Sequence, residues 1–186
     1  YMERYVLEAL CVMKKYDIAM KRMKIRYADM VSAPFSTLWE LWNYRPADNS
    51  NGTYNHGWSG GPMIILSKYI AGIVPETPGY GTYLISPNEC GMKEINCRVS
   101  TVKGDILFYI NNSESWKTEY RLSSPQGTKA ILRLPRNCAK YKIKVNGRAV
   151  ISYDSTPVWS IEGCSVLRSD KEYLYVAIDP GYWVIE

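Results

Sequence analysis

The feature that most constrains the fold is an abrupt change in residue usage around Pro75, Pro78 and Gly81. Before it, the chain is rich in Met, Leu and Ala, and apolar residues recur at the three- and four-residue spacing of amphipathic helices. After it, short alternating runs rich in Val, Ile, Tyr and Thr are typical of β-strands. The change predicts two parts with different secondary structure, residues 1–82 and 83–186, with the boundary near residue 82.

Three helices are expected in the first part. Residues 2–15 and 18–31 each carry a helical apolar pattern, and Asp17 between them is a candidate N-cap. Residues 59–73 predict a third helix, with Pro62 in its first turn, where a missing N–H costs nothing. The apolar positions of the first two helices cover more of the circumference than packing on one small core requires, so we expect neighbours on several sides. Because the chain opens within the first helical pattern, we also expect it to be a fragment of a longer protein.

The second part is expected to be an antiparallel β-sandwich. Its strongest local signal is Asn146-Gly147, a favoured two-residue hairpin turn, between the segments 141–145 and 149–151. Several short strands separated by turns over about 100 residues favour a sandwich. Further strands are predicted at residues 105–110, 118–122, 129–134 and 173–178.

Composition excludes several classes of partner and site. The net charge of +5 is small, and the basic residues between 14 and 26 are expected on a solvated helix face, so no nucleic-acid partner is predicted. Uninterrupted apolar runs such as residues 63–66 are far short of the roughly 20 residues that cross a bilayer, so no membrane partner is predicted. Five cysteines without a C-x-x-C pair and a single histidine indicate neither a zinc site nor a disulfide framework. No metal or other cofactor is expected.

Aromatic and polar residues concentrate at residues 37–42 and 52–62, which hold three of the six tryptophans and the single histidine. This composition is typical of carbohydrate sites, because a sugar ring presents apolar C–H faces to aromatic rings and hydroxyl groups to polar partners. The candidate substrate-binding residues are Trp39, Trp42, Asn55, His56 and Trp58.

Glu40 is the carboxylate in the middle of this stretch. Hydrolysis of a glycosidic bond needs two carboxyl groups, one that protonates the leaving oxygen and one that activates water or attacks the sugar. Asp48 follows in a polar loop, but its spacing does not fix it opposite Glu40. From the residues alone, a buried carboxylate that caps a helix or pairs with an arginine is the favoured role of Glu40. A loop histidine such as His56 often only hydrogen-bonds backbone, and the tryptophans are equally suited to packing.

The order of these motifs resembles that of bacterial α-L-rhamnosidases, glycoside hydrolase family 78. The matching pieces are residues 37–42, residues 52–56, the Gly-rich helix start at 60–61, and residues 69–80. The resemblance is close from about residue 3 to residue 87 and weaker beyond. It implies the last helices of a catalytic (α/α)6 barrel followed by a β-sandwich, and an inverting hydrolysis of α-L-rhamnosides. It also implies that Glu40 is the general base and that His56 lines the sugar pocket.

The chain departs from the family pattern in two ways. Many members have Arg and Asp beside the second Trp of the motif, where this chain has Leu41 and Asn43. The general acid would lie on an earlier part of the barrel, which no stretch of this chain matches. We therefore expect a rhamnose-containing carbohydrate as ligand, the remainder of the parent enzyme as partner, no turnover by the chain alone, and self-association through exposed helix faces. The alternative is a non-catalytic carbohydrate-binding protein whose tryptophan-rich loop holds sugar without cleaving it.

Overall fold

The computed structural model describes residues 1–42, 52–114, 117–135, 143–151 and 161–186. It divides into two compact units, Tyr1–Ile70 and Ala71–Glu186. The division precedes the boundary predicted near residue 82, because the first two strands of the second unit begin at residues 73 and 82. Asn43, Asp48 and residues 141–142 of the predicted hairpin lie outside the described residues. In the described part of the chain, no helix is long and apolar enough to cross a membrane.

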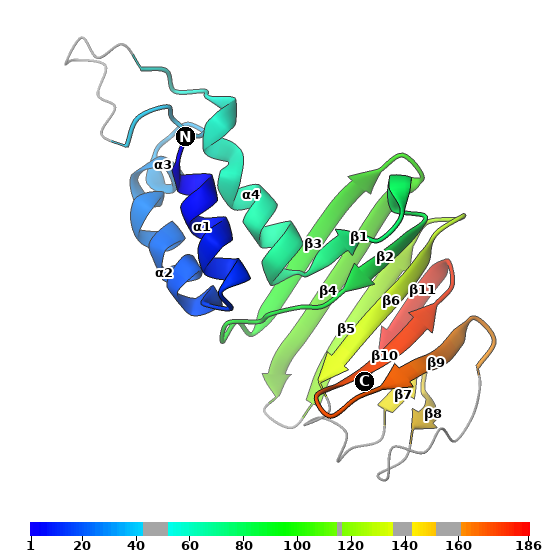
Figure 1. Ribbon diagram of the computed structural model, residues 1–186. Helices are drawn as coiled ribbons and strands as arrows, with labels where there is room; N and C mark the ends of the chain where they lie inside the picture. Colours follow the sequence, from blue (N-terminus) through cyan, green and yellow to red (C-terminus); the bar gives the residue numbers. More distant parts are fainter. Residues whose placement is uncertain (43–51, 115–116, 136–142, 152–160) are drawn as a thin grey trace. The chain divides into compact units, whose positions relative to one another are not determined.

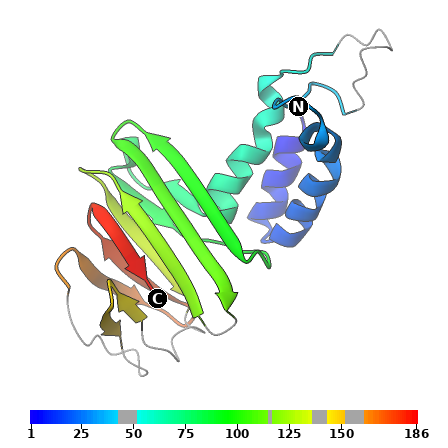
Figure 2. The same cartoon turned by 180° about the vertical axis from the view of Figure 1, so that it is seen from behind.

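The first unit is helical, and α1 lies between α2 and α4 in both views (Figures 1 and 2). Leu7 and Cys11, four residues apart on one face of α1, are buried against Ala19 and Met23 of α2 and Ile65 of α4. The helical elements are α1 (Glu3–Val12), α2 (Tyr16–Arg26), α3 (Ala28–Ser32), η2 (Gly57–Gly60), α4 (Gly61–Ile65) and the π-helical η3 (Leu66–Ile70).

The helix boundaries differ from the prediction at three points. Asp17 is not an N-cap, because α2 begins at Tyr16 and Asp17 lies in its first turn. At this position the negative charge of Asp17 interacts favourably with the helix dipole. The second predicted helix is split at Tyr27, whose φ of −100° and ψ of 4° are not helical. The third helical segment ends at Ile70 because Gly72 has a left-handed φ of 72°. Pro62 lies in the first turn of α4, as predicted.

The second unit consists of two β-sheets (Figure 2). One sheet has the order β1-β2-β6-β10-β9, and its strands are β1 (Ile73–Pro75), β2 (Thr82–Ile85), β6 (Lys129–Pro135), β10 (Tyr173–Ile178) and β9 (Cys164–Ser169). The other has the order β3-β4-β5-β11-β7-β8, and its strands are β3 (Glu94–Thr101), β4 (Gly104–Glu114), β5 (Lys117–Ser124), β11 (Gly181–Ile185), β7 (Ile143–Val145) and β8 (Arg148–Ile151). A short 3-10 turn, η4 (Pro78–Tyr80), connects β1 to β2.

The two sheets share one apolar core, which makes this unit a β-sandwich. Alternate residues are buried in β2 and β6, as expected when one face of a sheet is covered. Leu132 and Leu134 of β6 belong to the same core cluster as Ile106 and Phe108 of β4. Tyr83 of β2 is fully buried in this core, and its hydroxyl group donates a hydrogen bond to Ser124 at 2.8 Å.

Nearly all strand pairs are antiparallel, but β2 and β6 pair in parallel, with Tyr83 opposite Ala130 and Ile85 opposite Leu132. This parallel pair is an exception within the predicted antiparallel sandwich. It arises because β3, β4 and β5, which lie between β2 and β6 in the sequence, belong to the other sheet. The chain therefore returns to the first sheet through a long crossover rather than a hairpin.

Candidate functional site

Two chain segments of the first unit run beside each other at the candidate site. The backbone N–H of Glu40 donates to the carbonyl oxygen of Thr53 at 2.9 Å, and that of His56 donates to the carbonyl oxygen of Leu38 at 3.0 Å. These two bonds place a single residue, Trp39, opposite the pair Tyr54 and Asn55, as in a β-bulge. A short strand-like ladder therefore fixes the backbone on both sides of Glu40.

Trp39 and Glu40 turn to opposite sides of this segment, as successive residues of an extended chain do. Trp39 is buried against Met30 and Tyr27, and its ring meets Tyr54 edge-on at a centroid distance of 5.2 Å. The hydroxyl group of Ser59 donates to the carbonyl oxygen of Trp39 at 2.5 Å. Trp39 thus anchors the segment in the core, while the side chain of Glu40 stays 22% exposed.

The Glu40 carboxylate contacts the described residues through one oxygen, Oε2. It accepts a hydrogen bond from the backbone N–H of Thr53 at 3.1 Å and a long one from the Thr53 hydroxyl group at 3.4 Å. Nδ1 of His56 lies 3.5 Å from the same atom. Within the described residues, nothing pairs with Oε1, so this oxygen is free to accept a proton or a hydrogen bond from a ligand or a water molecule.

His56 joins the carboxylate to an exposed aromatic ring. Its Nδ1 lies 3.2 Å from the Thr53 hydroxyl oxygen, and its ring packs on Trp58 at a centroid distance of 4.2 Å. Trp58 is 46% exposed. No partner for Nε2 of His56 occurs in the part of the chain that the structure describes, so this nitrogen faces no competing bond. We call Glu40, Thr53, His56 and Trp58 the Glu40 cluster.

The other predicted site residues have separate surroundings. Trp42 meets Tyr27 edge-on at 4.9 Å and lies under the guanidinium group of Arg26 at 5.5 Å, so its ring takes part in packing. Asn55 is exposed, and its carbonyl oxygen accepts a bond from the Thr53 hydroxyl group at 3.4 Å.

Thr53 was not a candidate from the sequence, although it touches both polar members of the cluster. Thr53 lies three residues before His56 in the matched motif, and this spacing could have identified it. When the two segments pair, residue 53 comes to lie opposite Glu40. Elsewhere, His, Cys, Asp and Glu side chains of the described residues form no group of three that would hold a metal ion.

Residues 72–149, which lie in the second unit, match the family described as the bacterial alpha-L-rhamnosidase C-terminal domain. No curated protein matches the chain.

Two solved structures share the fold. The chain aligns over its whole length with 20% of the α-L-rhamnosidase from Dictyoglumus thermophilum, at 18% identity and a TM-score of 0.75. Over 80% of its length it aligns with 13% of the Streptomyces avermitilis α-L-rhamnosidase solved with L-rhamnose, at 17% identity and a TM-score of 0.57. The chain spans a fifth or less of these proteins. It resembles the C-terminal part of bacterial α-L-rhamnosidases, as the order of its motifs predicts.

Proposed function

We propose that the chain is the C-terminal part of a glycoside hydrolase that acts on α-L-rhamnosides with inversion, and that Glu40 is its general base. The observation that carries the proposal is the asymmetry of the Glu40 carboxylate, whose Oε2 is held by Thr53 and His56 while Oε1 has no partner among the described residues. The match of residues 72–149 to an α-L-rhamnosidase domain supports the substrate class.

The geometry suits the base of an inverting hydrolysis. In this reaction the base takes a proton from water while the water attacks the anomeric carbon, and a general acid protonates the leaving oxygen. Oε1 of Glu40 would hold that water and accept its proton. The bonds to Oε2 from the Thr53 backbone N–H and hydroxyl group hold the carboxylate in place. Such positioning before the reaction lowers the barrier, because little reorganisation is left for the reaction itself.

The remaining members of the Glu40 cluster are suited to hold a sugar ring. Nε2 of His56 would contact a sugar hydroxyl group, since Nδ1 is already engaged with Thr53. The exposed ring of Trp58 would cover an apolar C–H face. Asn55 would add a further polar contact, whereas Trp39 and Trp42 would act mainly by supporting the segment that carries Glu40.

The general acid is proposed to lie in the remainder of the parent enzyme. The helices of the first unit carry exposed apolar side chains such as Val12, Ile25 and Val31, which is expected of helices that pack against further helices in a barrel. We therefore expect the chain alone to leave rhamnosides intact. Measurable hydrolysis that depends on Glu40 in the purified chain would contradict this.

The decisive experiment is hydrolysis of a chromogenic aryl α-L-rhamnoside by the longer protein that carries this chain. Glu40→Gln should lower kcat by roughly 10²- to 10⁴-fold, because the amide cannot take the proton. L-Rhamnose binding and thermal unfolding should stay close to the wild type. Asp29→Asn, at an exposed carboxylate of α3, is the matched control and should keep full activity. Full activity of Glu40→Gln would sink the proposal.

A non-catalytic sugar-binding protein is the alternative, favoured by the exposed Trp58 ring packed on His56. The two functions separate in the parent protein. A hydrolase must place a second carboxyl group about 6.5–9.5 Å from Glu40. A parent that binds L-rhamnose with no such carboxyl group and no hydrolysis would establish the binding function.

A further inference from the structure

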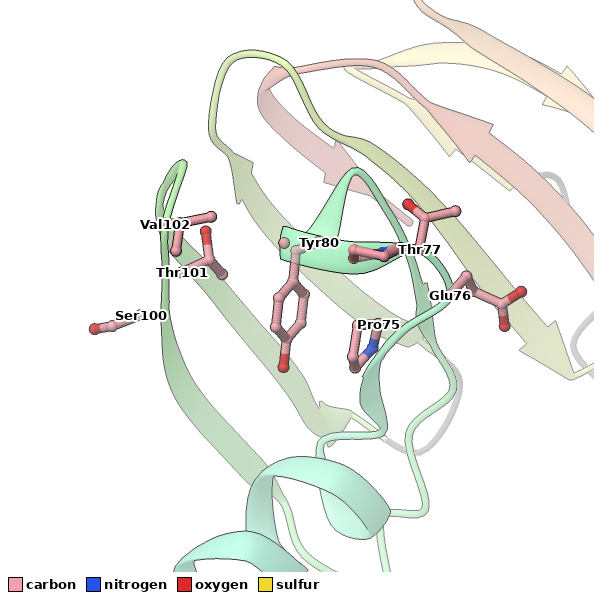
Figure 3. Close-up of a pocket in the computed structure, with 9 residues that line it drawn as sticks. Pro75, Glu76, Thr77, Tyr80, Ser100, Thr101 and Val102 are labelled. Atoms are coloured by element: carbon pink, nitrogen blue, oxygen red, sulfur yellow. The ribbon is translucent and has the colours of Figure 1, made fainter.

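The second unit carries an open depression of about 450 Å³, separate from the Glu40 cluster, whose residues all belong to the first unit. It lies between the β1–β2 connection and the turn that joins β3 to β4 (Figure 3). Its walls include Pro75, Thr77, Pro78, Tyr80, Ser100 and Val102. Its volume falls in the range of small-molecule sites, about 300–1,000 Å³.

The aromatic wall of this depression is held in an unfavourable backbone conformation. Gly79 and Tyr80 both have left-handed φ values, 64° and 58°. Glycine adopts such angles readily, but a bulky aromatic residue seldom does, and residues held this way gather at binding sites.

Hydrogen bonds close the loop around Tyr80 and impose this conformation. The N–H groups of Glu76 and Thr77 both donate to the carbonyl oxygen of Thr82, at 2.9 and 3.1 Å. The N–H of Thr82 donates in return to the hydroxyl oxygen of Thr77 at 2.7 Å. The loop therefore fixes the Tyr80 ring at the depression, between Pro75 and the strand end that carries Ser100 and Thr101 (Figure 3).

The depression presents apolar side chains and hydroxyl groups, and no charged group of its described lining residues lies at the Tyr80 ring. Tyr80 is half-buried, and its hydroxyl group has no hydrogen-bond partner among the described residues. The Ser100 hydroxyl group donates to Asp105 at 2.8 Å, which leaves its oxygen free to accept. Val102 is 87% exposed at the turn, and the Glu76 carboxylate points away from the ring (Figure 3).

We propose that this depression is a second carbohydrate-binding site, which holds one neutral sugar unit with an apolar face against the Tyr80 ring. The Tyr80 and Ser100 hydroxyl groups hydrogen-bond the hydroxyl groups of that unit. The choice of a sugar rests on the proposed function, because an aromatic ring flanked by hydroxyl groups suits a glycan, the substrate class of the Glu40 cluster. The site would keep a glycan on the enzyme at a point other than the one being cleaved.

The competing explanation is that Tyr80 only packs, since its ring lies at the edge of the sandwich core, 6.1 Å from the ring of Tyr83. The two explanations differ in what a soluble sugar does. A packing residue gives no response to a sugar, whereas a binding site changes the environment of the residues around the depression.

The test is an NMR titration of the ¹⁵N-labelled 186-residue chain with L-rhamnose and with a rhamnose-containing oligosaccharide. Amide signals of Thr77 and of residues 79–81 and 100–103 should shift. Tyr80→Gly removes the ring and relieves the left-handed backbone, and it should weaken binding at these residues by about 3- to 10-fold or more. Tyr80→Phe should keep most of the affinity. Tyr182→Ala, at an exposed tyrosine of β11, is the control and should bind as the wild type does.

The proposal is overturned if saturating sugar leaves the amide signals of Thr77 and of residues 79–81 and 100–103 unshifted in the wild type, or if Tyr80→Gly binds as tightly as the wild type. The wild-type titration decides the matter even if Tyr80→Gly fails to fold. Shifts confined to residues 37–58 would overturn this site and leave the Glu40 cluster standing. Shifts at the depression together with full activity of Glu40→Gln would instead sink the proposed hydrolase function.

Discussion

Glu40 and Thr53 each donate a backbone hydrogen bond to the other. The N–H of Glu40 bonds the carbonyl oxygen of Thr53 at 2.9 Å, and the N–H of Thr53 bonds the Glu40 carboxylate at 3.1 Å. The carboxylate is therefore oriented first by backbone, which any residue at position 53 except proline supplies. The Thr53 side chain adds a second contribution, which a substitution isolates.

Thr53→Val should lower kcat for aryl α-L-rhamnosides in the parent protein by about 2- to 10-fold, the effect expected of one lost hydrogen bond. Valine keeps the shape and the backbone N–H but loses the hydroxyl contacts to Glu40 and His56. Thr53→Ser keeps the hydroxyl group and should retain most of the activity. The measurement is kcat over a series of pH values, and equal kcat in Val and wild-type proteins would show that the hydroxyl group is dispensable.

Glu8 should stabilise the first unit only above acid pH. Hydrogen bonds from Lys68 at 2.8 Å and Tyr69 at 2.9 Å lower the pKa of the Glu8 carboxyl group. A carboxyl group with a lowered pKa stabilises the fold above its usual pKa, and this contribution is lost as the pH falls through the lowered value. Because Lys68 is 42% exposed, the contribution is at most about 1 kcal/mol.

Amide hydrogen exchange in α1 checks this prediction. Glu8→Gln should speed exchange at pH 7, and the difference from the wild type should vanish once the pH is low enough to protonate Glu8. A difference that persists at low pH would mean that Glu8 acts through its shape rather than its charge.

Glu89 should have the opposite pH dependence. Burial raises the pKa of its carboxyl group, against a lowering effect of a hydrogen bond from the Asn112 side chain. The folded state then holds a proton that the unfolded chain releases, so stability falls as the pH rises through the usual Glu pKa towards the raised one. Glu89→Gln removes this cost and should raise the free energy of unfolding at pH 7 by about 1 kcal/mol or less.

Thermal unfolding of the chain at several pH values measures the Glu89 effect. The gain in Glu89→Gln should disappear below about pH 4, where Glu89 is protonated in both states. Glu172→Gln, at an exposed position before β10, should change little at any pH. A constant gain at every pH would point to packing instead of ionisation.

The exposed apolar faces of the first unit should make the isolated chain self-associate. Val12 and Val31 are 69% and 77% exposed, and further apolar side chains of α1, α2 and α4 are exposed as well. Glu substitutions at Val12 and Val31 should lower the average mass in light scattering without lowering the melting temperature. Leu167→Glu, at an exposed residue of β9, is the control and should leave the average mass unchanged. A strictly monomeric wild-type chain would contradict the prediction.

Local signals predicted the parts of the fold that local chemistry determines. Asn146 and Gly147 both have positive φ, 49° and 77°, between β7 and β8, as the predicted hairpin turn requires. The strands predicted at 105–110 and 129–134 lie within β4 and β6. The strands β1, β2, β3, β9 and β11 were not predicted.

The strand β2 illustrates why some strands were not predicted. Its four residues pair in parallel with β6, whose sequence lies more than forty positions later, and three of them pair with the short strand β1 across the Pro78–Tyr80 connection. Because Pro78 and Gly81 lie beside it, the boundary between the two parts is predicted at this point instead of a strand. The pairing follows from burial of Tyr83 and Ile85 in the sandwich core, which is a tertiary effect.

In the candidate site, too, some residues were predictable from the sequence and others were not. Glu40 and His56 were selected by motif order, and the structure brings them within 3.5 Å of each other. Their roles in catalysis stay predictions. Thr53 escaped selection because threonine carries no distinctive chemistry in a sequence, and only the ladder between the two segments gives it contacts with both residues.

The parallel pairing of β2 with β6 bears on how the sandwich can be isolated. A piece that begins at residue 83 would lack β1 and the first residue of β2, so the three remaining residues of β2 would form an uncovered edge of the sheet. An uncovered strand edge offers its N–H and C=O groups to other chains and promotes aggregation. A piece that begins at residue 71 keeps both strands and is therefore the better candidate for a soluble, independently folding domain.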